Sequence, residues 1–139
     1  EAQERELLRR QLDGLALDLV GARGGNTFDA HRLSHLALEH GIQDAVVERL
    51  MRGYHCERAA IGDHDTLRAL AIDAGLPPDD VDDVLASDRY ADAVRADETL
   101  AAQLRIRAVP VFIADRARGV VGAQPAEELL ALLDGDPVE

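Results

Sequence analysis

Apolar residues recur at helical spacing through most of the chain, and the pattern changes to short extended runs after about residue 104. Glycines, prolines and short polar residues divide the helical pattern into separate helices. Asn26 and Asp63 are predicted N-caps, because their side-chain oxygens can accept hydrogen bonds from free first-turn amides. Leu15–Val20 is short enough to be a strand or a last helical turn. The predicted helices run from about Ala2 to Leu12, from Asn26 to Gly41, from Ile42 to Tyr54, from Asp63 to Gly75, from Pro78 into the acidic stretch that follows, and from Ser87 or Asp88 to Leu104.

The end of the chain has a different pattern. A continuous apolar run from Val109 to Ala114 is typical of a strand that is buried on both faces. Asp115–Arg118 is a predicted turn, Gly119–Gly122 a short return strand, and Pro125–Leu133 a final helix whose leucines can cover the sheet. Several helices followed by a hairpin and a helix predict the α+β class.

The composition narrows the classes of partner. The 139 residues have 47% apolar content, which is enough for a globular core, and a formal net charge of −12. Such an acidic surface repels nucleic acids and anionic membranes, so neither is an expected partner. No apolar run approaches the roughly 20 residues of a membrane span. Cys56 is the only cysteine, which excludes an intrachain disulfide and favours a reducing compartment, so we expect a cytoplasmic protein.

Three segments, taken together, resemble one protein family. They are Asn26–Arg32 (NTFDAHR), Ile61–Asp65 (IGDHD), and Val109–Ile113 (VPVFI) followed by Gly119–Pro125 (GVVGAQP). Their order and separation resemble the FrnE-like branch of the DsbA family, which is related to 2-hydroxychromene-2-carboxylate isomerases and kappa-class glutathione transferases. The resemblance implies a thioredoxin fold interrupted by a helical insertion. Residues 1–104 would be the insertion, and residues 105–139 would be the closing β-β-α part.

The resemblance also implies where a substrate would bind. Val109–Pro110 falls where the family has its cis-proline, which faces the redox cysteines and lies beside backbone that pairs with an extended substrate segment. Asn26 and Thr27 would lie where the insertion faces the thioredoxin part. These four residues are the candidate substrate-binding residues, although a capping role explains Asn26 equally well.

The redox chemistry that the resemblance implies is incomplete in this sequence. The family's opening strand and its Cys-x-x-Cys should precede the insertion, whereas this chain begins with Glu1 inside it. Thiol–disulfide exchange needs one thiol that attacks and a second that resolves the mixed disulfide, and Cys56 cannot do both. The catalytic residues are therefore unknown. We expect a truncated or degenerate form that is inactive alone as a dithiol oxidoreductase.

The hairpin predicts a partner. A two-stranded hairpin is marginal on its own, and the run from Val109 to Ala114 would leave an apolar edge. We expect this edge to be covered by a missing N-terminal segment or by a second chain, which would make the protein a homo-oligomer.

Several polar residues have both a functional and a structural interpretation. Cys56 is a candidate reactive thiol if His55 activates it, or an unreactive thiol at a helix end. His31 and His35 share a helical face, but the sequence implies no third ligand, so no metal site is expected. His64 has acidic neighbours that suit acid–base chemistry, whereas a cap at Asp63 accounts for the same motif.

Three functions from different classes follow. The leading hypothesis is a DsbA-like, FrnE-type thiol–disulfide oxidoreductase that acts on protein thiols or disulfides without a cofactor. The alternative is an isomerase or transferase of small molecules that uses glutathione, mycothiol or another small thiol. The third is a non-catalytic binding or assembly protein that keeps the scaffold.

Overall fold

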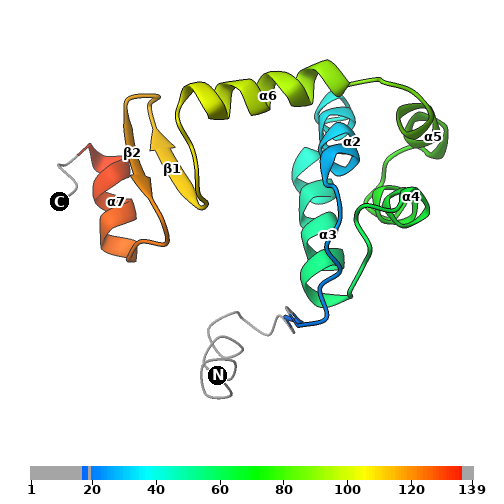
Figure 1. The fold of residues 1–139 in the computed structure, drawn as a ribbon, viewed down its shortest axis with the longest axis horizontal. Coiled ribbons are helices and arrows are strands. Elements are labelled where there is room, and N and C mark those ends of the chain that lie inside the picture. Colours follow the sequence, from blue (N-terminus) through cyan, green and yellow to red (C-terminus); the bar gives the residue numbers. More distant parts are fainter. Residues whose placement is uncertain (1–16, 19, 136–139) are drawn as a thin grey trace. The chain divides into compact units, whose positions relative to one another are not determined.

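The structure is a computed structural model that describes residues 17–18 and 20–135. The chain divides into two compact units, Glu1–Arg95 and Ala96–Glu139 (Figure 1). The predicted division after residue 104 follows the family's topology rather than packing, and it stays a prediction. The predicted helix from Ala2 to Leu12 lies outside the described residues.

Four helices build the core of the first unit as far as it is described. They are α2 (Phe28–Glu39), α3 (Gln43–Cys56), α4 (His64–Asp73) and α5 (Pro78–Ala86). Helix α2 packs against α3, α4 and α5, and α4 packs against both α3 and α5 (Figure 1). Helix α6 (Ala91–Gln103) follows. The order and type of these helices confirm the pattern predicted from the apolar spacing.

Aliphatic side chains fill the centre of this bundle, as the small number of aromatic residues predicts. Tyr54 and Tyr90 pack against it only at the periphery. Each fully buried leucine or valine contributes roughly 1.5–3 kcal/mol to the free energy of unfolding. The buried side chains therefore give the helices a stabilising core of their own. Its largest fully buried side chains are Leu33, Leu36, Val46, Leu67, Leu76, Val81 and Val84.

Two of the helices end at a glycine in the same way. Gly41 after α2 and Gly75 after α4 have positive φ, 70° and 106°. In each case the amide of the next residue, Ile42 or Leu76, donates to a carbonyl five positions back. This is the Schellman arrangement, which satisfies helix-end carbonyls and turns the chain sharply. Both helix ends confirm the predicted stops.

One predicted cap is confirmed. The carboxylate of Asp63 accepts a hydrogen bond from the Thr66 amide at 2.9 Å at the start of α4.

The predicted cap of α2 is displaced by one residue, and the predicted cap of α6 is wrong. The Asn26 oxygen accepts from a first-turn amide as predicted, that of Phe28 at 2.9 Å, although the N-cap position itself is Thr27. Helix α6 begins only at Ala91, because the Ser87 hydroxyl is used in the turn that follows α5.

A buried arginine joins α2 to the end of α5. Arg32 is only 5% exposed. Its guanidinium donates to the carbonyls of Val84, Ser87 (2.5 Å) and Arg89 (3.0 Å), and it also donates to the carboxylate of Asp29 at 2.9 Å. Carbonyls at the C-terminal end of a helix have no partner within the helix and carry negative partial charge. Arg32 therefore satisfies the end of α5 and fixes the loop that leads to α6.

The second unit contains an antiparallel hairpin of β1 (Val111–Ala114) and β2 (Arg118–Val121). Three residues, Asp115–Ala117, connect the paired Ala114 and Arg118. The Ala117 amide donates to the Ala114 carbonyl at 3.1 Å, so Asp115 and Arg116, with positive φ of 54° and 57°, are the central residues of the turn. Positive φ at both central residues is what a type I′ turn requires, and its twist matches that of the two strands. The prediction of a hairpin is confirmed, with β1 shorter than the apolar run at 109–114.

Helix α7 (Ala126–Asp134) packs on β2 and completes the second unit. Val120 of β2 and Leu132 of α7 are both buried. Arg118 donates to the Asp115 carboxylate at 2.9 Å and to the Leu132 carbonyl at 3.3 Å. This one side chain thereby ties the hairpin turn to the end of α7.

Replacing Arg32 with Met should destabilise the helical unit by about 3 kcal/mol, because its charged hydrogen bonds to the carbonyls of Val84, Ser87 and Arg89 are lost. The matched control is Arg52→Met, which removes an exposed pair with Glu48 and should cost less than about 0.5 kcal/mol. Urea unfolding followed by helical circular dichroism measures both. Equal losses in the two variants would contradict the role assigned to Arg32.

Candidate functional site

The first candidate site is the Val109–Pro110 segment that leads into β1. The peptide bond between these residues is cis, as the resemblance implies for this position. The Pro110 carbonyl accepts the Gly122 amide at 2.8 Å, which extends the hairpin ladder by one pair. Val109 comes directly before this anchor and is 86% exposed. Within the described part of the chain, its backbone groups make no hydrogen bond.

The strand that follows is paired along one edge only. Among the described residues, β2 is the sole neighbour of β1, so the other edge of β1 presents free backbone groups. Its side chains are also open to solvent, since Phe112 is 38% and Ile113 is 45% exposed. Val121 of β2 and Leu130 and Leu133 of α7 extend the exposed apolar surface. The strand predicted to be buried on both faces is thus partly exposed, with Val111 and Ala114 half-buried.

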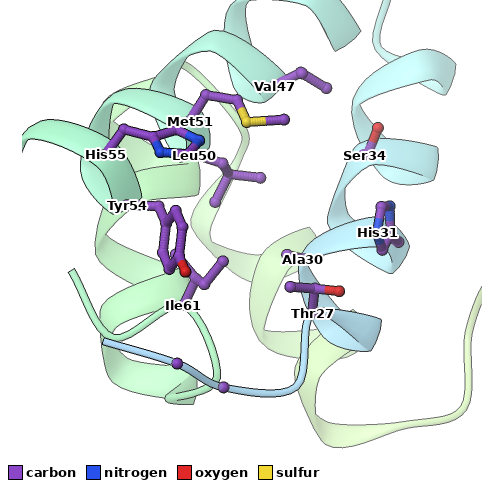
Figure 2. A pocket seen from close by; sticks show the side chains of 12 residues that line it. Thr27, Ala30, His31, Ser34, Val47, Leu50, Met51, Tyr54, His55 and Ile61 are labelled. Atoms are coloured by element: carbon purple, nitrogen blue, oxygen red, sulfur yellow. The ribbon is translucent and has the colours of Figure 1, made fainter. Parts of the chain in front are cut away.

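The second candidate site is a cavity of about 390 Å³ in the helical unit, between α2 and α3. Figure 2 shows Thr27, His31 and Ser34 from α2 on one side and Met51, Tyr54 and His55 from α3 on the other. Ala30, Val47, Leu50 and Ile61 add an apolar floor, and the backbone of Gly24 and Gly25 closes one end. Such a cavity, mostly apolar with a few polar groups, suits a small organic ligand.

Of the residues predicted from the sequence to bind substrate, Asn26 and Thr27 belong to the edge of this cavity that precedes α2. Thr27 lines it, whereas Asn26 is occupied by its turn with Phe28. The side of the cavity formed by α3 was missed. A spacing of four from Val47 to Met51 to His55 places these side chains on one helical face, which is the signal that could have found them.

Two of the family-like segments meet at the end of the cavity. A Cβ on Gly25 would lie 3.1 Å from the Gly62 amide nitrogen, so the two loop backbones are in close contact. The His64 ring also lies 2.8 Å from the Asp29 carboxylate. The acid–base candidate His64 is therefore part of a link between α2 and α4 at this position.

Cys56 is the last residue of α3 and is half-buried, with a free thiol. The ring of its neighbour His55 packs edge-on against Tyr54, with centroids 4.8 Å apart. His55 also lines the cavity, which Cys56 does not. Cys56 and His55, the candidate members of a reactive pair, thus have different surroundings.

The two histidines on α2 also have different surroundings. His31 lines the cavity, whereas the ring of His35 stacks on Tyr90 with centroids 6.3 Å apart. The described part of the chain contains no group of three or more histidine, cysteine, aspartate or glutamate side chains placed to hold a metal ion.

Hydrogen bonds shift the titration of two exposed carboxylates. The Thr66 amide, and then its hydroxyl at 2.8 Å, hold the pKa of Asp63 below its ordinary value. Hydrogen bonds from the Arg68 guanidinium likewise lower the pKa of Asp82. Both groups are exposed, so these shifts describe helix capping and surface pairing rather than a catalytic centre.

The helical unit, the antiparallel hairpin and the helix on its face are the parts of a thioredoxin-like protein with a helical insertion. Residues 5–134 match the family described as a DSBA-like thioredoxin domain, and the chain belongs to that family. The crystal structure of a probable DsbA oxidoreductase from Streptomyces coelicolor is 42% identical to it, with a TM-score of 0.83. That match covers 99% of this chain and 62% of the other, so the chain spans less than two thirds of that protein. A search of curated proteins finds no match.

These findings confirm the predicted DsbA-like fold and family. The FrnE-like branch stays a prediction. Within the described residues, no helix is long and apolar enough to span a membrane.

Replacing Asp63 with Asn should lower the melting temperature near neutral pH, because the amide oxygen replaces a charged acceptor at the start of α4. Since the pKa of Asp63 is lowered by folding, its stabilising effect is present above its unfolded-state pKa of about 3.9 and is lost as the pH falls through the folded value. The difference between wild type and variant should therefore shrink below about pH 4.

The matched control is Asp44→Asn, which removes a first-turn carboxylate of α3 that makes no capping bond. Thermal melts from pH 3 to pH 7 measure all three proteins. A difference that stays constant across this range would contradict the assignment of the cap.

Proposed function

We propose that this chain is the insertion and closing part of a FrnE-type, DsbA-like thiol–disulfide oxidoreductase, and that the redox cysteine pair lies outside this sequence. The observation that carries the proposal is the free backbone of the highly exposed Val109, beside the anchored Pro110. Free amide and carbonyl groups on an extended segment can pair with an extended polypeptide. This segment would hold a substrate while a cysteine pair acts on it.

The chemistry then divides between two parts of the protein. An attacking thiolate forms a bond to one sulfur of a substrate disulfide, and the other substrate sulfur leaves as a thiolate. A second thiolate of the enzyme then breaks this mixed disulfide, which leaves the substrate reduced and the enzyme pair oxidised. Cys56, as the only cysteine of the sequence, cannot perform both steps. The reverse sequence would oxidise a substrate.

The open edge of β1 supports the proposed partner. A thioredoxin-like sheet needs more strands than the two described here, and the exposed Phe112 and Ile113 would be buried by them. We propose that an N-terminal strand–helix–strand segment covers this edge. Where that segment is absent, a second copy of the chain would cover it, which makes a homo-oligomer.

The cavity between α2 and α3 favours a second candidate function. Its volume of about 390 Å³ and its polar groups, among them His31, His55 and Ser34, suit a small molecule better than a protein segment. In that case the protein would be an isomerase or transferase that uses glutathione or mycothiol. It would then carry no cysteine pair upstream and would not reduce insulin.

Insulin reduction by dithiothreitol tests the leading proposal. The 139-residue chain should not accelerate the reaction, and the chain joined to its natural upstream segment should do so. Cys56→Ser should leave that activity unchanged, whereas serine at the first upstream cysteine should abolish it. Activity of the 139-residue chain that is lost on Cys56→Ser would contradict the proposal. An upstream segment without a cysteine pair would favour the small-thiol enzyme or a non-catalytic protein.

The coverage of the β1 edge has a separate test. The 15.0 kDa chain alone should associate in size-exclusion chromatography with light scattering, because its apolar edge can pair with another copy. Ile113→Lys places a charge on this edge and should return the chain to a monomer. Leu38→Lys, at an exposed leucine of α2, is the matched control and should leave association unchanged. A well-folded wild-type monomer would refute the predicted coverage.

A further inference from the structure

The charge of the chain reverses around the Val109–Pro110 segment. The full sequence has 27 acidic and 15 basic residues. Residues 105–118 contain four arginines and a single acidic residue, Asp115. Two of these arginines, Arg105 and Arg107, lie in the short stretch between the end of α6 and Val109. The segment proposed to hold a substrate therefore has positively charged residues next to it in the sequence, although the protein as a whole is acidic.

Arg105 and Arg107 differ from most arginines of the described chain in having no partner. Among the described residues neither makes an ion pair or a side-chain hydrogen bond, and both are exposed. Salt bridges to carboxylates involve Arg32, Arg49, Arg52, Arg58, Arg68, Arg89 and Arg118. In a chain with an excess of carboxylates, two adjacent arginines without partners leave their donors available to another molecule.

The backbone holds Arg105 in an unusual position. Arg105 has φ of 56° at the end of α6, and the Ile106 amide donates to the Ala101 carbonyl five positions back. This is the same arrangement that ends α2 and α4, where Gly41 and Gly75 take the position with positive φ. Arginine adopts this conformation less readily than glycine. The helix end thus presents a guanidinium where the two other helices present no side chain.

We propose that Arg105 and Arg107 select acidic substrates, by binding carboxylates of an extended polypeptide whose backbone pairs with Val109. This inference rests on the proposed function, because it assigns the substrate class of the same segment. Guanidinium groups bind carboxylates in a planar, two-pronged geometry, which gives them direction as well as charge. An acidic residue a few positions from the paired backbone would fit this arrangement.

The overall charge of −12 does not oppose this selection at short range. Charges in solution are screened over about 8 Å at physiological ionic strength, so an approaching segment senses mainly the groups beside it. Nucleic acid is a poorer fit, because its closely spaced phosphates would extend beyond the few arginines into acidic surface.

Fluorescence anisotropy with the full-length natural protein tests the inference. The probes are three fluorescein-labelled, cysteine-free peptides of the same apolar pattern that carry Glu, Gln or Lys at every third position. The Glu peptide should bind about fivefold to twentyfold more tightly than the Gln peptide at low salt, since each exposed pair contributes roughly twofold to fivefold. The Lys peptide should bind most weakly. This order should fade as salt rises, because the pairs are exposed.

The variant R105Q/R107Q should remove most of the preference for Glu. Arg116→Gln is the matched control, because Arg116 is an exposed arginine in the turn at the far end of β1 and should leave the preference intact. Urea midpoints of all variants should equal that of the wild type. A double variant that loses stability in place of the preference would overturn the inference, since the arginines would then be structural.

The outcomes separate this inference from the proposed function. Equal binding of all three peptides, with insulin reduction intact, would overturn the acidic preference and leave the oxidoreductase standing. Binding of no peptide, together with no insulin reduction, would overturn both. Loss of the preference in Arg116→Gln to the same extent as in R105Q/R107Q would also overturn the inference, because general charge would then explain it.

Discussion

The backbone of a β-strand has hydrogen-bonding groups along both edges, and among the described residues β1 has a strand partner on only one. Pairing with β2 and the contact of α7 with β2 satisfy that side of the small sheet. The opposite edge, together with the exposed Phe112 and Ile113, is stable only when something covers it. Both the proposed N-terminal segment and the proposed homo-oligomer follow from this single constraint. The described part of the helical unit differs, because it has an aliphatic core of its own.

The helical unit depends on polar interactions at the ends of its helices as much as on its core. Arg32 holds carbonyls at the end of α5, and Asp63 holds amides at the start of α4. Gly25 lines the cavity and lies close to Gly62, and the Asp29–His64 pair links α2 to α4. The cavity itself is lined partly by core residues, among them Ala30, Leu50 and Ile61. Polar contacts at helix ends and packing of the core therefore act together in the helices that carry its lining.

Elements that arise from local periodicity could be predicted from the sequence, and contacts between distant segments could not. The helices and the hairpin followed from apolar spacing, and the stops at Gly41 and Gly75 followed from the conformational freedom of glycine. The Asn26 oxygen bonds a first-turn amide as predicted, but the helix begins one residue later than expected, with Thr27 at the N-cap. Arg32 carries no local signal, because its carbonyl partners lie more than 50 positions away. The α3 side of the cavity was missed because the helical face shared by Val47, Met51 and His55 does not by itself show that α2 lies opposite it.

The residues that reveal the family are mostly residues that build the scaffold. In the first two family-like segments, Asn26 forms a turn, Arg32 holds a helix end, and Asp63 caps a helix. Such positions identify the fold because the fold requires them, and they carry no information on the reaction. In the described chain, the segment around Val109 combines the family pattern with free backbone groups, exposure and a position beside the open edge of β1. Membership in the DsbA-like family therefore establishes the architecture, whereas activity depends on the thiols that this segment would face.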